Sequence, residues 1–103
     1  MIQMEVRHFR IVQEILGKYP YSFYAFGSRA KKTQKPFSDL DLCFVEPISW
    51  EVLAKISEDF EESNLPFKVE LINWHRSSET FQNLIRKDLV LIQGKDFLQD
   101  PGI

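Results

Sequence analysis

The chain has 103 residues, the length of one domain, and with 44% hydrophobic and 27% charged residues its composition is that of a globular protein. Its formal net charge of -2 argues against a general nucleic-acid-binding surface, and no apolar run is long enough to span a membrane. The single cysteine, Cys43, rules out an internal disulfide and gives no sign of a zinc cluster. Because the first residues lack the form of a signal peptide, we expect a cytoplasmic protein.

The first half of the chain predicts one helix and two strands. Helical spacing predicts a helix over residues 2–16, with an apolar stripe made of Ile2, Val6, Phe9, Val12 and Leu16. The short aromatic run 21–26 is typical of a buried strand. Alternating residues predict a second strand over 39–45, whose apolar face consists of Leu40, Leu42 and Phe44.

The second half predicts two helices and two strands. Ser49 is placed to cap a helix, and Ser77 or Ser78 to start another. The strand predicted over 67–74 carries Phe67, Val69 and Leu71 on one face and Lys68, Glu70 and Ile72 on the other. A last strand is predicted over 89–93.

Helices interleaved with short strands predict an α/β or α+β fold with a sheet of three or four strands. Three amphipathic helices are available to cover the sheet. We expect a single domain over residues 1–103, with a flexible tail over about 95–103.

Two aspartates interrupt the second predicted strand. Asp39 and Asp41 stand at positions i and i+2, so they project from one face about 6.5 to 7 Å apart. Like charges repel, and burial makes each ionised carboxylate more costly. A hard cation such as Mg²⁺ removes both penalties, because such ions take oxygen ligands. The alternative is that Asp39 closes a turn while Asp41 points into solvent, so the pair alone is a weak signal.

A glycine–serine pair and a basic loop precede the aspartates. Gly27 ends the first predicted strand and permits close approach of the backbone to a phosphate, while Ser28 adds a hydroxyl donor. Four cations follow without an acid among them: Arg29, Lys31, Lys32 and Lys35. Taken alone, the pair is equally compatible with a plain turn. Together, the cradle, the basic loop and the carboxylates would set an anion beside a metal, as phosphoryl transfer requires.

A third carboxylate lies in the strand predicted over 67–74. Glu70 is flanked by Val69 and Leu71, where a charge needs a reason. If this strand lies beside the one over 39–45, Glu70 faces the two aspartates and can complete a metal site or accept a proton. The alternatives are an ion pair with Lys68 or an edge-strand position in water.

The order of Gly27-Ser28, ten intervening residues and Asp39-Leu40-Asp41 resembles the signature of the DNA polymerase β-type nucleotidyltransferase superfamily. The short form "AFGSRA…SDLDL" resembles its minimal nucleotidyltransferase (MNT) branch, and the likeness extends from the first helix to about Gln93. The resemblance implies a nucleotidyltransferase fold, in which helices pack on one side of a small mixed sheet. It also implies a site for Mg²⁺ and a nucleoside triphosphate.

The resemblance also implies roles for individual residues. Three residues are expected to bind the triphosphate: Gly27, Ser28 and Arg29. Three carboxylates are expected to hold two magnesium ions and to serve catalysis: Asp39, Asp41 and Glu70. Glu70 departs from the family pattern, which more often has Asp at this position, although the extra methylene still allows its carboxylate to reach.

Members of the MNT branch are similar to antitoxins encoded beside a helical HEPN-domain protein. The resemblance therefore implies transfer of AMP from ATP to a hydroxyl of a partner protein, within a hetero-oligomer. The chain ends at Ile103 without room for a substrate domain, so we expect the acceptor on another chain. Trp50 and Trp74 are candidates for the contact surface, with the core as the alternative for each.

Two other functions stay open from the sequence. In the first, the protein is a non-catalytic binding module that neutralises its partner by contact, an alternative that the Glu at position 70 favours. Alternatively it is an enzyme whose acceptor is an RNA end or a small molecule, although the net charge argues mildly against a large RNA footprint.

Overall fold

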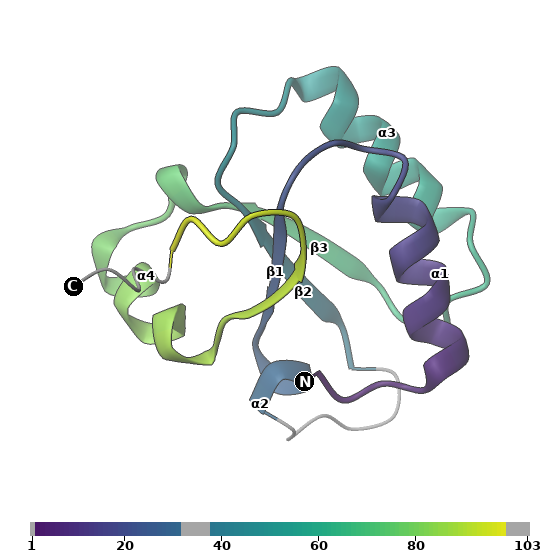
Figure 1. Cartoon of the computed structure of the whole chain (residues 1–103), viewed down its shortest axis with the longest axis horizontal. Coiled ribbons are helices and arrows are strands. Elements are labelled where there is room, and N and C mark those ends of the chain that lie inside the picture. The colour runs from purple at the N-terminus through teal and green to yellow at the C-terminus, as the bar shows by residue number, and fades with distance from the viewer. Residues whose placement is uncertain (1, 32–37, 99–103) are drawn as a thin grey trace.

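The structure is a computed structural model that describes residues 2–31 and 38–98. Its elements are α1 (Val6–Leu16), β1 (Phe23–Phe26), α2 (Ser28–Lys31), β2 (Leu40–Phe44), α3 (Trp50–Glu61), β3 (Val69–Asn73), η1 (Trp74–Arg76), α4 (Glu79–Ile85), η2 (Arg86–Asp88) and β4 (Val90–Gln93). Four strands form one sheet in the order β3-β2-β1-β4 (Figure 1). The predicted small mixed sheet is confirmed.

Strand pairing brings distant segments of the chain together. β1 runs antiparallel to both β2 and β4, whereas β2 and β3 are parallel and are joined through α3, because parallel neighbours need a crossover. In the register, Phe26 lies opposite Asp41, and Asp41 lies opposite Glu70. The end of β1 and the starts of β2 and β3 therefore meet at one end of the sheet.

Two serine caps fix where the longer helices of the second half begin. The Ser49 hydroxyl accepts a hydrogen bond from the Val52 amide at 3.2 Å, as predicted for α3. At α4 the sequence left two serines open, and Ser78 is the cap, accepting from the Phe81 amide at 3.1 Å.

The first helix is shorter than predicted. α1 begins at Val6 rather than at residue 2, and Val6 is 70% exposed although the predicted stripe includes it. The Gln3 amide donates to the Arg29 carbonyl at 2.9 Å, which holds the first residues against α2 in place of a helical turn. Ile2 is still buried, but it reaches the core from outside the helix.

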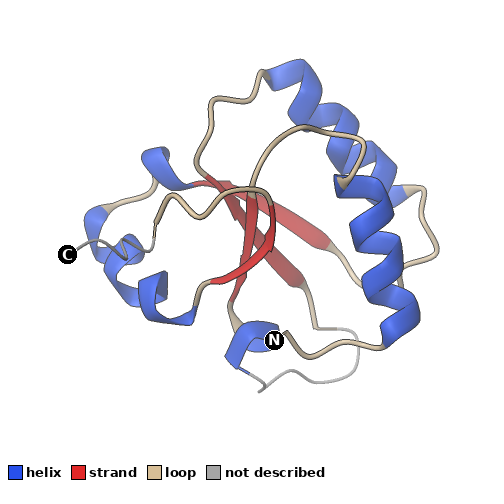
Figure 2. Cartoon of the chain, viewed as in Figure 1, coloured by secondary structure: helices blue, strands red, loops and turns tan. Residues whose placement is uncertain are grey.

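Helices cover both faces of the sheet. α1 and α3 lie together on one face, while α4 lies on the other (Figure 2). The first face carries the predicted apolar set Leu40, Leu42 and Phe44, all fully or almost fully buried. On the second face Phe81 of α4 packs edge-on against Phe26, with ring centroids 5.7 Å apart. This second layer adds to the expected arrangement, in which helices cover one side.

Both tryptophans for which the sequence left a choice have clear positions, as does Cys43. Trp74 is 5% exposed and belongs to the apolar cluster that contains Phe26, whereas Trp50 is 80% exposed at the start of α3. Cys43 is fully buried, and burial raises the pKa of its thiol to about 11, as expected for an inert cysteine.

The segment after β4 is tied to the sheet. The Tyr24 hydroxyl donates to the Asp96 carboxylate at 2.8 Å and accepts from the Phe97 amide at 2.6 Å. The Lys95 amide donates to the Ser22 hydroxyl at 2.8 Å. These contacts hold residues 95–98 beside β1, while the rest of the segment expected to be flexible lies outside the described residues. In the part of the chain that the structure covers, no helix has the length and apolar character needed to cross a bilayer.

Candidate active site

Gly27 and Asp41 are packed against each other where β1 ends and β2 begins. The antiparallel register places Phe26 opposite Asp41, so Gly27, the residue that follows β1, lies beside the Asp41 side chain. Gly27 has φ +81°, and a Cβ atom there would lie 2.5 Å from Asp41 Oδ2. Glycine is required twice over, because the backbone conformation and the contact both exclude a side chain. The sequence predicted a glycine close to a phosphate, and it did not reveal this contact with the carboxylate.

Three carboxylates converge at this end of the sheet. Asp41 and Glu70 are register partners on parallel strands, and Asp39 precedes β2. The condition under which the sequence placed Glu70 near the two aspartates is therefore met. Burial raises the pKa of the Asp41 carboxyl, and the charges of Glu70 and Asp39 raise it further. Asp41 is half-buried, while Asp39 and Glu70 are exposed. A cation bound here would relieve the repulsion.

The residues fit a magnesium ion that is held jointly with a nucleotide. Among residues 2–31 and 38–98, no group of three or more His, Cys, Asp or Glu side chains is arranged to hold a metal ion alone. Mg²⁺ is usually bound through one or two carboxylates together with substrate phosphates. A half-buried carboxylate with a raised pKa, set beside two further carboxylates, suits that mode of binding. Ligation of metal by Asp39, Asp41 and Glu70 stays a prediction.

Arg29 is built into the fold at this end of the molecule. Its side chain is 5% exposed, Nε donates to the Ser38 carbonyl and Nη1 to the Gln3 carbonyl, each at 3.0 Å. The guanidinium also lies 4.1 Å from the centre of the Phe67 ring. Burial lowers the pKa of Arg29, and the charge of Asp39 partly offsets this. Arg29 thus ties α2 to Ser38 and to the first residues of the chain, a positioning role that the sequence did not reveal.

The other residues of the predicted phosphate cradle are described only in part. Ser28 is the first residue of α2 and directly follows Gly27. Lys31 ends α2, and Lys32 and Lys35 lie outside the described residues. Binding of phosphates by Gly27, Ser28 and Arg29 stays a prediction.

The sequence matches the family model described as polymerase beta, nucleotidyltransferase, over residues 11–97. A relative from Haemophilus influenzae, named probable protein adenylyltransferase MntA, is 42% identical over 90 residues, covering 84% of this chain and 79% of the relative.

Solved structures have the same fold at low sequence identity. A crystal structure of a toxin–antitoxin with AMP-PNP aligns with a TM-score of 0.65 at 18% identity, covering 84% of this chain and 73% of that chain. A protein from Shewanella oneidensis aligns with a TM-score of 0.61 at 12% identity, covering 89% and 74%. A mutant of the MntA-HpeT toxin–antitoxin aligns with a TM-score of 0.59 at 13% identity, covering 84% and 73%. These likenesses show a shared fold, and the family match identifies it as the nucleotidyltransferase fold.

Proposed function

Because the chain belongs to the polymerase beta nucleotidyltransferase family, we propose that it transfers AMP from ATP to a hydroxyl group of a partner protein. Membership makes it a nucleotidyltransferase enzyme. The name of the Haemophilus relative, a probable protein adenylyltransferase, supports a protein as the acceptor. The use of ATP is consistent with a cytoplasmic location.

One observation carries this proposal. The Asp41 carboxylate is packed against Gly27 at the end of β1 and stands in register with Glu70 on β3. This contact joins the predicted phosphate cradle directly to the predicted metal ligands, which are ten or more residues away along the chain. The negative charge gathered there suits a reaction that brings its own cations.

The reaction is an in-line displacement at the α-phosphorus of ATP. A bond forms between the acceptor oxygen and the α-phosphorus, the bond to the bridging oxygen breaks, and pyrophosphate leaves. Gly27 and Ser28 would bind the triphosphate, and Asp39 and Asp41 would hold its two magnesium ions. Bound Mg²⁺ would neutralise the phosphate charge and lower the pKa of the attacking hydroxyl. Glu70 is exposed and accepts the proton that the acceptor loses.

The partner in this proposal is a helical HEPN-type protein encoded beside the chain. Two of the solved structures with the same fold are toxin–antitoxin assemblies, which supports the antitoxin half of such a pair as the role of this chain. Modification of a hydroxyl on the toxin would silence it.

The direct test is incubation with ATP labelled at the α-phosphate, Mg²⁺ and the product of the neighbouring gene. We expect covalent label on the partner from the wild-type protein, loss of label from Asp41→Asn, and full labelling from the control Asp59→Asn. Label that persists in Asp41→Asn would refute the assigned site. Label on RNA or a small molecule in place of the partner would move the acceptor to another class.

A second candidate is a binding module without catalysis. It is favoured by Glu70, which stands where the family more often has Asp. In the same experiment this candidate predicts a tight complex whose partner stays unlabelled with the wild-type protein.

A further inference from the structure

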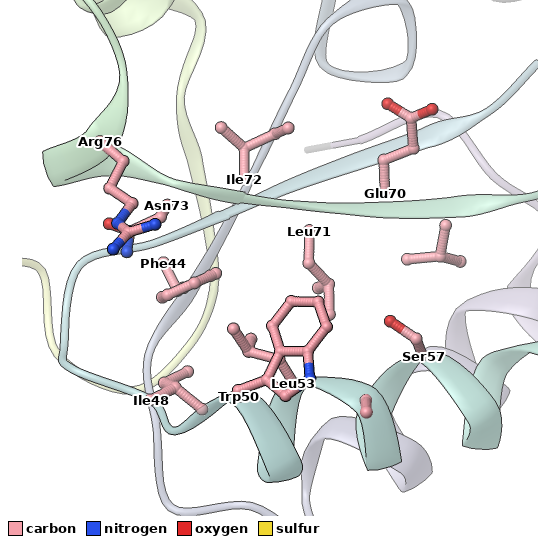
Figure 3. Close-up of a pocket in the computed structure, with 12 residues that line it drawn as sticks. Phe44, Ile48, Trp50, Leu53, Ser57, Glu70, Leu71, Ile72, Asn73 and Arg76 are labelled. Carbon is pink, nitrogen blue, oxygen red and sulfur yellow. The ribbon is translucent and has the colours of Figure 1, made fainter.

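A hollow of about 670 Å³ runs along the outer edge of β3. One wall is α3, with Trp50, Leu53 and Ser57 facing the strand (Figure 3). Leu71 points toward α3, while Glu70 and Ile72 point to the opposite side of the strand, yet all three line the same hollow. Because both faces of β3 contribute to it, the hollow follows the edge of the strand and is not a pit in one face.

The backbone along this edge is available for pairing. Within the described sheet β3 is an end strand and pairs with β2 only. The Leu40 amide donates to the Lys68 carbonyl at 2.9 Å, so alternation directs the backbone of Glu70 and Ile72 toward β2 as well. The backbone groups of Val69 and Leu71 therefore point outward into the hollow. An exposed row of this kind is a template for an added strand.

The order of functional groups across the sheet indicates that the acceptor protein binds in the hollow. Gly27 follows β1, Asp41 lies on the adjacent β2, and Glu70 lies on β3 at the edge. In-line attack needs the entering oxygen on the side of the phosphorus opposite the leaving pyrophosphate. With the triphosphate on the β1 side, the acceptor comes from the β3 side. Glu70 borders both the carboxylate cluster and the hollow, so the two are continuous.

We propose that the edge of β3 and Trp50 bind an extended segment of the acceptor protein, which adds to the sheet as a fifth strand and brings its hydroxyl to Glu70. This inference rests on the proposed function and names how the acceptor is recognised. The five residues of β3 accommodate a segment of similar length, about 16 Å. Trp50, 80% exposed, provides an apolar surface for a side chain of that segment. Arg76 at the other end favours an acidic residue there (Figure 3).

Hydrogen exchange tests the docking without relying on catalysis. Exchange is followed in the chain alone and in its complex with the neighbouring HEPN-type protein. We expect slower exchange of the amides of β3 in the complex and no change in β4, the opposite edge strand, which is the internal control. Unchanged exchange in β3 would overturn the proposal. So would protection of β3 in the chain alone that rises with its concentration, because the occupant would then be a second copy.

A kinetic test separates binding of the acceptor protein from binding of the nucleotide. Trp50→Ala should raise KM for the partner about tenfold or more and leave the affinity for Mg²⁺–AMP-PNP within about twofold. The matched control is Leu84→Ala on α4, 64% exposed and not part of the hollow, which should change neither value. Equal values for the two variants, or weakened AMP-PNP binding in Trp50→Ala, would overturn the docking proposal. Absence of transfer by the wild-type protein would instead refute the proposed function, and the exchange experiment would still decide the docking.

Discussion

Asp41 and Asp59 are two carboxylates in opposite surroundings. Asp59 on α3 accepts a hydrogen bond from the Tyr19 hydroxyl and pairs with Lys18 at 2.9 Å and Lys55 at 3.4 Å. These partners, the Tyr19 hydrogen bond foremost, lower the pKa of Asp59 to about 2. Asp41 is partly buried beside two further carboxylates, and its pKa is raised.

The difference separates a structural acid from a functional one. At Asp59 the protein itself supplies the donors and positive charges that an ionised carboxylate needs. At Asp41 burial and the described neighbours Glu70 and Asp39 disfavour the ionised carboxylate, which is typical of a functional acid.

The largest expected effect is on catalysis. Asp41→Asn should lower the rate of transfer to the partner by about a hundredfold or more, because a neutral amide neither attracts nor holds the cations of the reaction. The rate is measured with ATP labelled at the α-phosphate. Asp59→Asn should keep the rate of the folded protein near that of the wild type, and equal losses in both variants would contradict the contrast.

Two glycines with positive φ allow strain to be separated from function. Gly27→Ala should cost about 1 to 3 kcal/mol and abolish transfer, because the new Cβ would displace the Asp41 carboxylate. Gly94, with φ +85°, is the matched control, since a Cβ there would collide with Ser22 away from the carboxylates. Gly94→Ala should lower the midpoint of urea unfolding and leave the activity of the folded fraction intact. Retention of activity in Gly27→Ala would refute the site.

Replacement of the structural acid should lower stability instead of activity. Asp59→Asn loses hydrogen bonds to an ionised acceptor, and we expect the free energy of unfolding to fall by about 1 to 2 kcal/mol. Urea titration near neutral pH measures this change. An unchanged midpoint would show that the cluster around Asp59 contributes little.

The same acid should make stability depend on pH. A carboxyl whose pKa is about 2 in the folded protein, below about 3.9 in the unfolded chain, contributes stability that is fully present above about pH 4. That contribution is lost as the pH falls toward 2. The difference in unfolding free energy between wild type and Asp59→Asn should therefore shrink over this interval. A constant difference would contradict the assignment.

The smallest expected effect is a gain in stability, opposite in sign to the loss expected for Asp59→Asn. In the absence of metal, Asp41→Asn should stabilise the fold by less than about 1 kcal/mol, because it removes a charge that burial, Glu70 and Asp39 disfavour. Thermal unfolding in the presence of a chelator measures this. Marked destabilisation would indicate that the Asp41 carboxylate is structural.

The local pattern of the sequence predicted most of the elements. Alternation placed Leu42 and Phe44 on the buried face, and Ser49 marked the start of α3, because these signals depend on near neighbours in the chain. The sequence left open whether Asp41 and Glu70 lie on adjacent strands, and their register shows that they do.

Features that depend on tertiary packing were not visible. Arg29 stands in a basic segment whose composition is typical of a phosphate-binding loop. Its buried contacts, however, are with Gln3 and Ser38, which lie in other segments of the chain. The apolar spacing of α3 would place Trp50 on the buried side of the helix. Trp50 is the first residue of the helix, however, and its side chain is exposed. The hollow along β3 exists only because that strand ends the sheet.

The central claim is that Asp39 and Asp41 bind the magnesium–nucleotide complex beside Gly27. Isothermal titration calorimetry with AMP-PNP, with and without Mg²⁺, tests it most directly. We predict that the wild-type protein and Asp59→Asn bind the nucleotide only when Mg²⁺ is present, and that Asp39→Asn and Asp41→Asn lose this binding. Undiminished Mg²⁺-dependent binding by Asp41→Asn, or no binding by the wild-type protein, would contradict the account.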